Sequence, residues 1–136
     1  MKISSKGRYA LLLLLDLAEH YKSDAVTLKE VAERKNISKK YLEQVIPIVS
    51  KAGILKTSRG AQGGYKLNEA PSSISAYKIL SLTESQLNEE REEDGEYALN
   101  TLSKGMDKAL REYLESISLE ELLLLQKNVE SDSYMI

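Results

Sequence analysis

Residues 27–67 read TLKEVAERKNISKKYLEQVIPIVSKAGILKTSRGAQGGYKL, and this stretch decides the fold. Thr27 followed by Glu30 forms a capping box, because the hydroxyl accepts from the Glu30 amide while the carboxylate reaches back to the Thr27 amide. The pattern predicts a helix that starts at Leu28 and ends at Asn36, a residue that tolerates a left-handed backbone. Ser38 is placed to cap a second helix. The apolar stripe of that helix consists of Leu42, Val45, Ile46 and Val49.

The segment between and after these helices completes the pattern. Only residues 36–38 separate the two helices, which is the length of the turn in a helix-turn-helix. Gly53 ends the second helix, and residues 54–58 and 64–67 then form two short strands around a glycine-rich tip. Gly60 and its neighbouring glycines supply the positive φ angles that a hairpin tip needs. The sequence therefore predicts a winged helix-turn-helix, mainly α with a small β-hairpin wing.

Polar residues at the start and on the outer face of the second helix point to DNA. In helix-turn-helix proteins these turns enter the major groove, where hydroxyl, amide and amine groups match base edges and phosphates. Arg59 at the slim hairpin tip suits a narrow minor groove. We therefore expect double-stranded DNA as the partner, and the alternative is a winged helix that makes only protein contacts. The outer-face residues are Ser38, Lys39, Lys40, Tyr41 and Gln44.

The charge distribution favours the DNA interpretation. The net charge of the chain is −2, which taken alone argues against nucleic acid. Residues 1–66, however, hold 13 Lys and Arg against 6 Asp and Glu, or +7. Residues 67–136 hold 6 against 15, or −9. This asymmetry indicates a basic binding face and a separate acidic body.

The composition excludes several classes of site. With no Cys, the chain can form no disulfide, no Cys-ligated zinc or iron–sulfur site and no Cys nucleophile. A single histidine, His20, leaves almost nothing for a multi-histidine metal site or a Ser-His dyad, and no phosphate loop follows a strand. We expect no metal, no cofactor and no enzymatic activity. His20 is expected at a helix end, where the dipole favours its cation.

The remaining segments predict a DNA-binding domain over residues 1–83, an acidic loop over 84–96, dimerisation helices over 97–130 and a tail over 131–136. Residues 5–21 are expected to form an apolar first helix that is too short for a membrane span, and nothing before it looks like a signal peptide. Apolar residues then recur at alternating steps of three and four, the seam of two packed helices. A homodimer helix is favoured, and the alternative is a helix lying on its own domain. The seam residues are Leu99, Leu102, Met106, Ala109 and Tyr113.

Three motifs together resemble the bacterial Rrf-type regulators: MKISSKGRYA at 1–10, ISKKYLEQVI at 37–46 and SRGAQGGYKL at 58–67. This winged-helix family includes an iron–sulfur regulator, a nitric-oxide sensor and a repressor of cysteine metabolism, and the chain is most like the last. The resemblance implies a cytoplasmic homodimeric transcription factor, usually a repressor, that binds an imperfect palindrome. It places base readout at Ser38, Tyr41 and Gln44, minor-groove insertion at Arg59, and phosphate contact at Lys2, Ser4 and Arg8. The cluster-binding members carry cysteines in the region that matches residues 84–96, whereas this chain has none.

The last residues, Tyr134, Met135 and Ile136, have two interpretations. Most chain ends are frayed and carry no function. An aromatic residue before a terminal isoleucine, however, resembles the tail of the cysteine-metabolism repressor and the tail that serine acetyltransferase inserts into O-acetylserine sulfhydrylase. A terminal carboxylate held by backbone amides is a known docking mode. The resemblance therefore implies that enzyme as a second partner.

Overall fold

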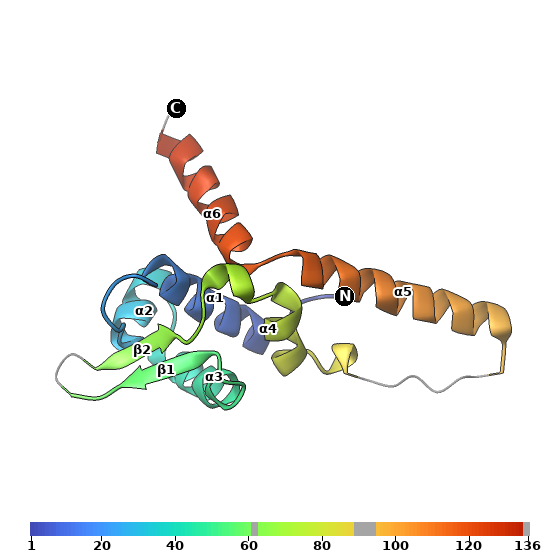
Figure 1. Cartoon of the computed structure of the whole chain (residues 1–136), viewed down its shortest axis with the longest axis horizontal. Helices are drawn as coiled ribbons and strands as arrows, with labels where there is room; N and C mark the ends of the chain where they lie inside the picture. Colours follow the sequence, from blue (N-terminus) through green and yellow to red (C-terminus); the bar gives the residue numbers. More distant parts are fainter. Residues whose placement is uncertain (61–62, 89–94, 135–136) are drawn as a thin grey trace.

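The computed structural model describes residues 1–60, 63–88 and 95–134. For residues 132–134 it describes the backbone only. The winged helix-turn-helix is confirmed: two short helices are followed by a two-stranded antiparallel hairpin (Figure 1). In chain order the elements are α1 (Ser5–Glu19), α2 (Leu28–Lys35), α3 (Lys39–Lys51), β1 (Leu55–Ser58), β2 (Gly64–Leu67), η1 (Pro71–Ser73), α4 (Ala76–Thr83), η2 (Ser85–Leu87), α5 (Tyr97–Ser116) and α6 (Leu119–Tyr134).

Helix α1 is the centre of the core. Because its sequence is apolar nearly all round, it is buried between α2, α3, α4 and α6. Its one buried charge is Asp16, which is 1% exposed. The Arg34 side chain of α2 donates to both carboxylate oxygens of Asp16, from Nε at 2.9 Å and from Nη2 at 2.8 Å. This bidentate pair fixes α2 on α1 and raises the pKa of Arg34.

The helix-turn-helix forms as its capping residues predict. Thr27 Oγ1 accepts from the Glu30 amide and Glu30 Oε1 accepts from the Thr27 amide, each at 3.2 Å. The hydrogen bond from the Thr27 amide is the largest cause of a lowered pKa at Glu30. Asn36 ends α2 with φ 53° and ψ 50°, and the Ser38 hydroxyl accepts from the Lys40 amide at 3.2 Å to start α3. The turn between the helices is therefore set by local hydrogen bonds.

The wing is anchored by a residue that the sequence analysis missed. Val26, in the loop before α2, exchanges two backbone hydrogen bonds with Tyr65 of β2, at 3.0 and 2.7 Å. A Cβ at Gly64 would collide with the Val26 carbonyl, so the approach of Val26 to β2 requires glycine there. The hairpin is consequently fixed to the helix-turn-helix at its base.

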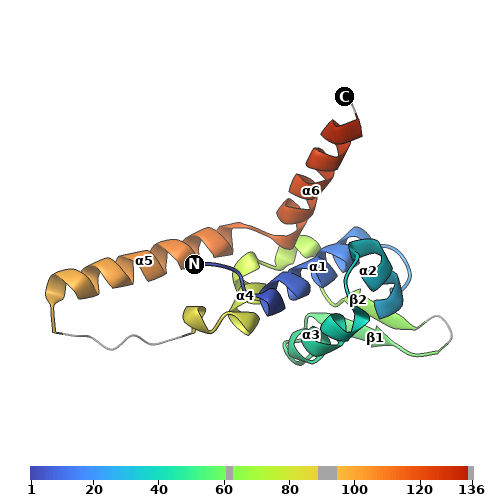
Figure 2. The ribbon, with the colours of Figure 1, turned by 180° about the vertical axis from the view of Figure 1, so that it is seen from behind.

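Helices α5 and α6 leave the body in different directions (Figures 1 and 2). Their junction is held by a short antiparallel bridge, in which the Ala76 amide donates to Ile117 O and the Leu119 amide donates to Ile74 O, both at 2.8 Å. Leu119 is fully buried in the main core. The end of α5 packs on α4 through Leu114, and Arg111 stacks over the Tyr77 ring with its Cζ 5.0 Å from the centroid. The C-terminal helices are therefore attached firmly to the DNA-binding half.

Three predicted boundaries were wrong. The first helix ends at Glu19 rather than at residue 21, with His20 as its C-cap and His20 Nδ1 2.8 Å from the Asp16 carbonyl oxygen. The acidic loop does not begin at residue 84, because Glu84 is buried and Ser85–Leu87 form the turn η2. Residues 131–134 belong to α6, since no Gly or Pro stops that helix after Ser118 starts it. Residues 89–94 lie outside the described part of the chain.

Candidate nucleic-acid interface

Helix α3 and the wing lie along one edge of the molecule, on the side opposite α6 (Figures 1 and 2). The N-terminal part of α1 joins this edge through a stack of two tyrosines. The Tyr9 and Tyr41 rings lie 4.8 Å apart between centroids and are inclined by 6°. The start of α1 and the outer face of α3, which both carry predicted DNA-binding residues, therefore lie side by side.

The outer face of α3 presents the predicted side chains to solvent. Lys40 and Gln44 are exposed, and Lys39 lies 4.0 Å from the Glu43 carboxylate one turn along the helix. Tyr41 is 42% exposed, and one face of its ring is covered by Tyr9. An edge and the hydroxyl of Tyr41 are thus available to DNA, whereas the stacked face is not.

The wing tip also presents its predicted residues. Arg59 and Gly60 are exposed, and Gly60 has φ 103°, a left-handed conformation that favours glycine. A Cβ at Gly63 would lie 2.6 Å from Ser58 O and 2.9 Å from Gly60 O, so the chain turns back too tightly for a side chain there. Glycines therefore keep the tip slim around the single arginine, as a groove requires.

At the start of α1 the structure changes the interpretation of one residue. Lys2 and Arg8 are exposed, as phosphate contacts should be. The Ser4 hydroxyl, however, is used inside the protein: it accepts from the Gly7 amide at 3.1 Å and donates to Glu84 Oε2 at 2.6 Å. Ser4 is the N-cap of α1, and its hydroxyl hydrogen is already committed to Glu84. The structure therefore adds a capping role for this hydroxyl, and the phosphate contact predicted for Ser4 stays a prediction.

Sequence reasoning missed two residues that shape this surface. Tyr9 lies on a helix that reads as a buried apolar element, so its pairing with Tyr41 across two helices left no local signal. Glu84 stands at the head of the acidic run 84–96, where a solvated carboxylate is the ordinary interpretation. The break between the apolar pattern of 76–83 and the acidic run was the one hint that Glu84 could belong to the helix end.

The predicted seam on α5 is exposed. Leu99, Leu102, Met106 and Tyr113 are between 53% and 62% exposed, and Ala109 is exposed as well. The residues of α5 that pack on the protein's own domain are different ones, Leu110 and Leu114. One face of α5 thus lies on its own domain, whereas the seam residues are exposed, and their role in a homodimer stays a prediction.

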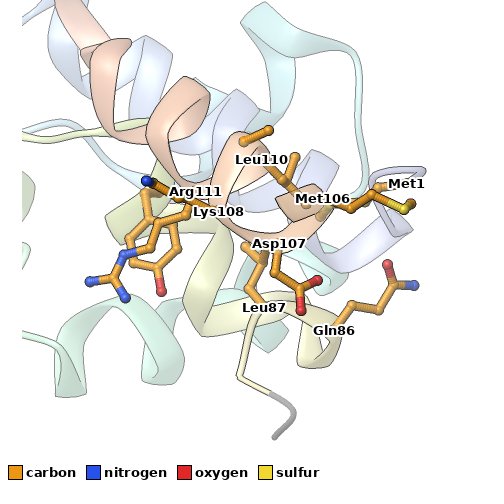
Figure 3. A pocket seen from close by; sticks show the side chains of 10 residues that line it. Met1, Gln86, Leu87, Met106, Asp107, Lys108, Leu110 and Arg111 are labelled. Atoms are coloured by element: carbon orange, nitrogen blue, oxygen red, sulfur yellow. The ribbon is translucent and has the colours of Figure 1, made fainter. Parts of the chain in front are cut away.

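A pocket of about 740 Å³ lies beside this helix (Figure 3). Met1, Leu87 and Met106 line it from three segments that are distant in the sequence, together with Tyr77, Leu110 and Arg111. Met106 and Ala109 of the seam therefore border a groove between α5 and the body. The side chain of Tyr134 and the whole of Met135 and Ile136 lie outside the described residues.

Comparison with known proteins identifies the fold's family. Residues 3–124 match the model of the Rrf2 family, described as iron-dependent transcriptional regulators. The chain belongs to the Rrf2 family. It is 38% identical over 136 residues to the HTH-type transcriptional regulator CymR of Bacillus subtilis, covering 99% of this chain and 98% of CymR. It is 34% identical to IscR of Aliivibrio salmonicida over 131 residues, covering 91% of this chain and 78% of IscR.

A solved structure supports the same assignment. The structure of CymR, the global cysteine regulator of B. subtilis, matches with a TM-score of 0.83 at 37% identity, over 92% of this chain and 98% of that one. This Rrf2 protein is therefore a DNA-binding transcriptional regulator and not an enzyme. The resemblance of the three motifs to Rrf-type regulators is confirmed.

The iron in the description of the Rrf2 family does not fit the donor atoms of this chain. It has no Cys, and its one histidine, His20, has Nδ1 directed at a backbone carbonyl oxygen. Among the side chains that the structure describes, those of residues 1–60, 63–88 and 95–131, no three His, Asp or Glu residues gather in a way that could hold a metal ion. No step of iron sensing is assigned to this Rrf2 protein. Among the same residues, no helix is both long and apolar enough to cross a membrane.

Proposed function

We propose that this Rrf2 protein is a cytoplasmic homodimeric repressor that binds an imperfect palindrome in the promoters of cysteine and sulfur metabolism genes. The observation that carries the proposal is that α3 and the wing lie on the same side of the molecule, opposite α6, with their predicted DNA-binding residues exposed. In each subunit Ser38, Tyr41 and Gln44 meet base edges in the major groove, and Arg59 with Gly60 enters the adjacent minor groove. Lys39 and Lys40 contact phosphates beside them, and Lys2 and Arg8 contact phosphates at the start of α1.

Dimerisation supplies the second half-site. A palindrome needs two copies of the interface related by a two-fold axis. The seam of α5 supports this role, because it places four large apolar side chains in solvent along one helix face. A second copy of α5 would cover these side chains.

Cysteine metabolism is proposed from similarity. CymR of B. subtilis is the global cysteine regulator, and this chain aligns with it along nearly its full length. We further propose that Tyr134–Ile136 dock in the active site of O-acetylserine sulfhydrylase, with the terminal carboxylate held by backbone amides. Isothermal titration of the purified sulfhydrylase with the full chain should show binding that is lost when Ile136 is deleted. No heat with the full chain, or equal affinity after the deletion, would refute the docking.

DNA binding is tested by affinity as a function of salt and sequence. The wild-type protein should select a palindromic duplex from a random pool and bind it with an affinity that falls steeply with salt. Lys40→Ala should weaken all duplexes alike, whereas Gln44→Ala should relax preference at one position per half-site. Lys127→Ala on α6 makes the same charge change away from the interface and should alter neither property. Binding that is weak and insensitive to salt would instead favour a protein-interaction module.

The dimer is tested by sedimentation. Leu102→Glu places a charge in the seam and should give monomers, because an unpaired carboxylate is costly in a buried interface. Thr101→Glu adds the same charge at the neighbouring position on another face of α5 and should leave the dimer intact. If both variants were dimers, the seam of α5 would not be the dimer interface.

A further inference from the structure

The start of α1 is fastened to the end of α4 by one buried carboxylate. Glu84 is 6% exposed, and its Oε1 accepts from the Ser4 amide at 2.5 Å while its Oε2 accepts from the Ser4 hydroxyl at 2.6 Å. Both polar groups by which Ser4 can donate are thus given to a residue 80 positions away in the chain. The contact closes the N-terminal end of α1 against the segment that leads toward α5.

The packing around this contact has room for the carboxylate and for little else. Gly7 is buried, and a Cβ on it would lie 2.9 Å from Glu84 Oε2 and 3.0 Å from both Ile3 Cγ2 and Thr83 Oγ1. The space that a side chain at residue 7 would fill is therefore occupied by Glu84. Gly7 also donates its amide to the Ser4 hydroxyl at 3.1 Å, so three residues share one arrangement.

Electrostatics favour an ionised carboxylate in this position. The N-terminus of a helix carries a partial positive charge that attracts anions. Burial opposes ionisation of Glu84, but the hydrogen bonds from the Ser4 hydroxyl and amide and from Thr83 outweigh burial, and its pKa is lowered. Glu84 thus supplies an internal anion where a DNA phosphate could otherwise approach the Ser4 amide.

This arrangement bears on DNA binding through the N-terminal arm, residues 1–4, which precedes α1 without regular structure. Ser4 is the point at which the arm joins the body, and Lys2 stands two residues before it. If Ser4 were released, Lys2 would lie on an unanchored end and would lose configurational entropy on meeting a phosphate. On the strength of the proposed function, we infer that Glu84 is a positioning residue for DNA binding, which holds the N-terminal arm through Ser4 so that Lys2 meets the phosphate backbone.

The proposed interface carries two cations, Lys40 and Lys2, that are held in place in different ways. Lys40 is carried by α3, whose start is fixed by its own cap at Ser38. Lys2 depends on a contact with a distant segment. Loss of Glu84 should therefore reduce the contribution of Lys2 to binding and leave that of Lys40 unchanged.

The test measures affinity against salt for a duplex that the wild-type protein selects from a random pool. Each phosphate contact contributes a slope of about 0.9 in log affinity against log salt, so Glu84→Ala should lower the slope by about 0.9 per subunit. Affinity should fall about fivefold per subunit near physiological salt. Glu69→Ala makes the same charge change and breaks the ion pair between Glu69 and Lys78 at the start of α4, yet should keep the wild-type slope.

Two further variants address folding and charge. Gly7→Ala keeps the net charge but pushes the Glu84 carboxylate away from Ser4, and it should lower the slope as Glu84→Ala does. Glu84→Gln can still accept from the Ser4 amide and should give an intermediate slope. If Glu84→Ala does not fold, these two variants carry the test, with circular dichroism and sedimentation confirming fold and dimer.

A double-mutant cycle decides the mechanism. Lys2→Ala should lower the slope in the wild-type background and have no further effect in Glu84→Ala, whereas Lys40→Ala should lower it equally in both. A slope for Glu84→Ala equal to that of Glu69→Ala, or full additivity of Lys2→Ala with Glu84→Ala, would overturn the inference. Absence of salt-dependent binding by the wild-type protein would instead refute the proposed function itself.

Discussion

Replacing Arg34 with Ala should destabilise the protein through the carboxylate that it leaves behind. Asp16 is 1% exposed, and Arg34 provides a bidentate pair at 2.8 and 2.9 Å. Removing one partner of a buried pair costs about 3–5 kcal/mol, because the remaining charge is desolvated and unpaired. The Arg34 side chain is 37% exposed, so water can reach part of the vacated space, and we expect the low end, about 3 kcal/mol.

The assay is urea unfolding of the wild type, Arg34→Ala and a control. Lys108→Ala removes an ammonium that pairs with Glu112 at 3.9 Å on the surface, where water replaces the lost partner, so its effect should be small. The double variant Asp16→Ala with Arg34→Ala should lose less than the sum of the single losses, since no orphan charge remains. If Arg34→Ala cost no more than Lys108→Ala, the assignment of Asp16 to a buried, paired state would be refuted.

Three further predictions concern glycine positions and pH. Gly64→Ala should break the bridge between Val26 and the wing and lower the free energy of unfolding by about 2 kcal/mol, because two backbone hydrogen bonds are lost. Gly60→Ala introduces left-handed backbone strain but meets no neighbour within 4 Å, so urea unfolding should show a smaller loss. A Cβ at Gly105 meets no atom within 4 Å in one subunit, so Gly105→Ala should stabilise α5 by about 1 kcal/mol in thermal unfolding, and a lower melting temperature would contradict this expected gain. If the partner helix approaches at Gly105, sedimentation should show a weaker dimer for the same variant. The pKa of Glu84 is lowered in the folded state, so its contribution to stability is present above the ordinary pKa of 4.5 and is lost as pH falls through the folded-state pKa. Glu84→Gln should therefore flatten the dependence of the free energy of unfolding on pH below 4.5. An unchanged pH dependence would contradict an ionised, hydrogen-bonded Glu84.

Local signals in the sequence were sufficient for the helix-turn-helix. The capping box at Thr27, the left-handed Asn36 and the cap at Ser38 each act within four residues, and each is found where it was predicted. The wing followed from Gly53 and the tip glycines in the same way. Such features can be read from sequence because the groups that satisfy each other are neighbours in the chain.

The contacts that were missed join residues far apart in the chain. Val26 meets Tyr65, Tyr9 meets Tyr41, and Ser4 meets Glu84 across 80 positions. Neither periodicity nor capping rules carry information about such pairs, since each partner has an ordinary local explanation. Glu84 shows the consequence most clearly, because an acidic run predicts solvent exposure at every one of its residues.

The distant contacts bear on the proposed dimer, which would have to hold two half-sites at a fixed separation. The bridge between Ile74–Ala76 and Ile117–Leu119 ties the root of both α5 and α6 to the DNA-binding half, and Arg111 packs over Tyr77 beside it. If paired α5 helices form the dimer, the angle of α5 on its own body sets the distance between the two copies of α3. Glu84 joins the same α4 end to the start of α1. In the proposed dimer, we therefore expect that a change in the tilt of α5 would alter the half-site spacing and, through α4 and Glu84, the position of the N-terminal arm.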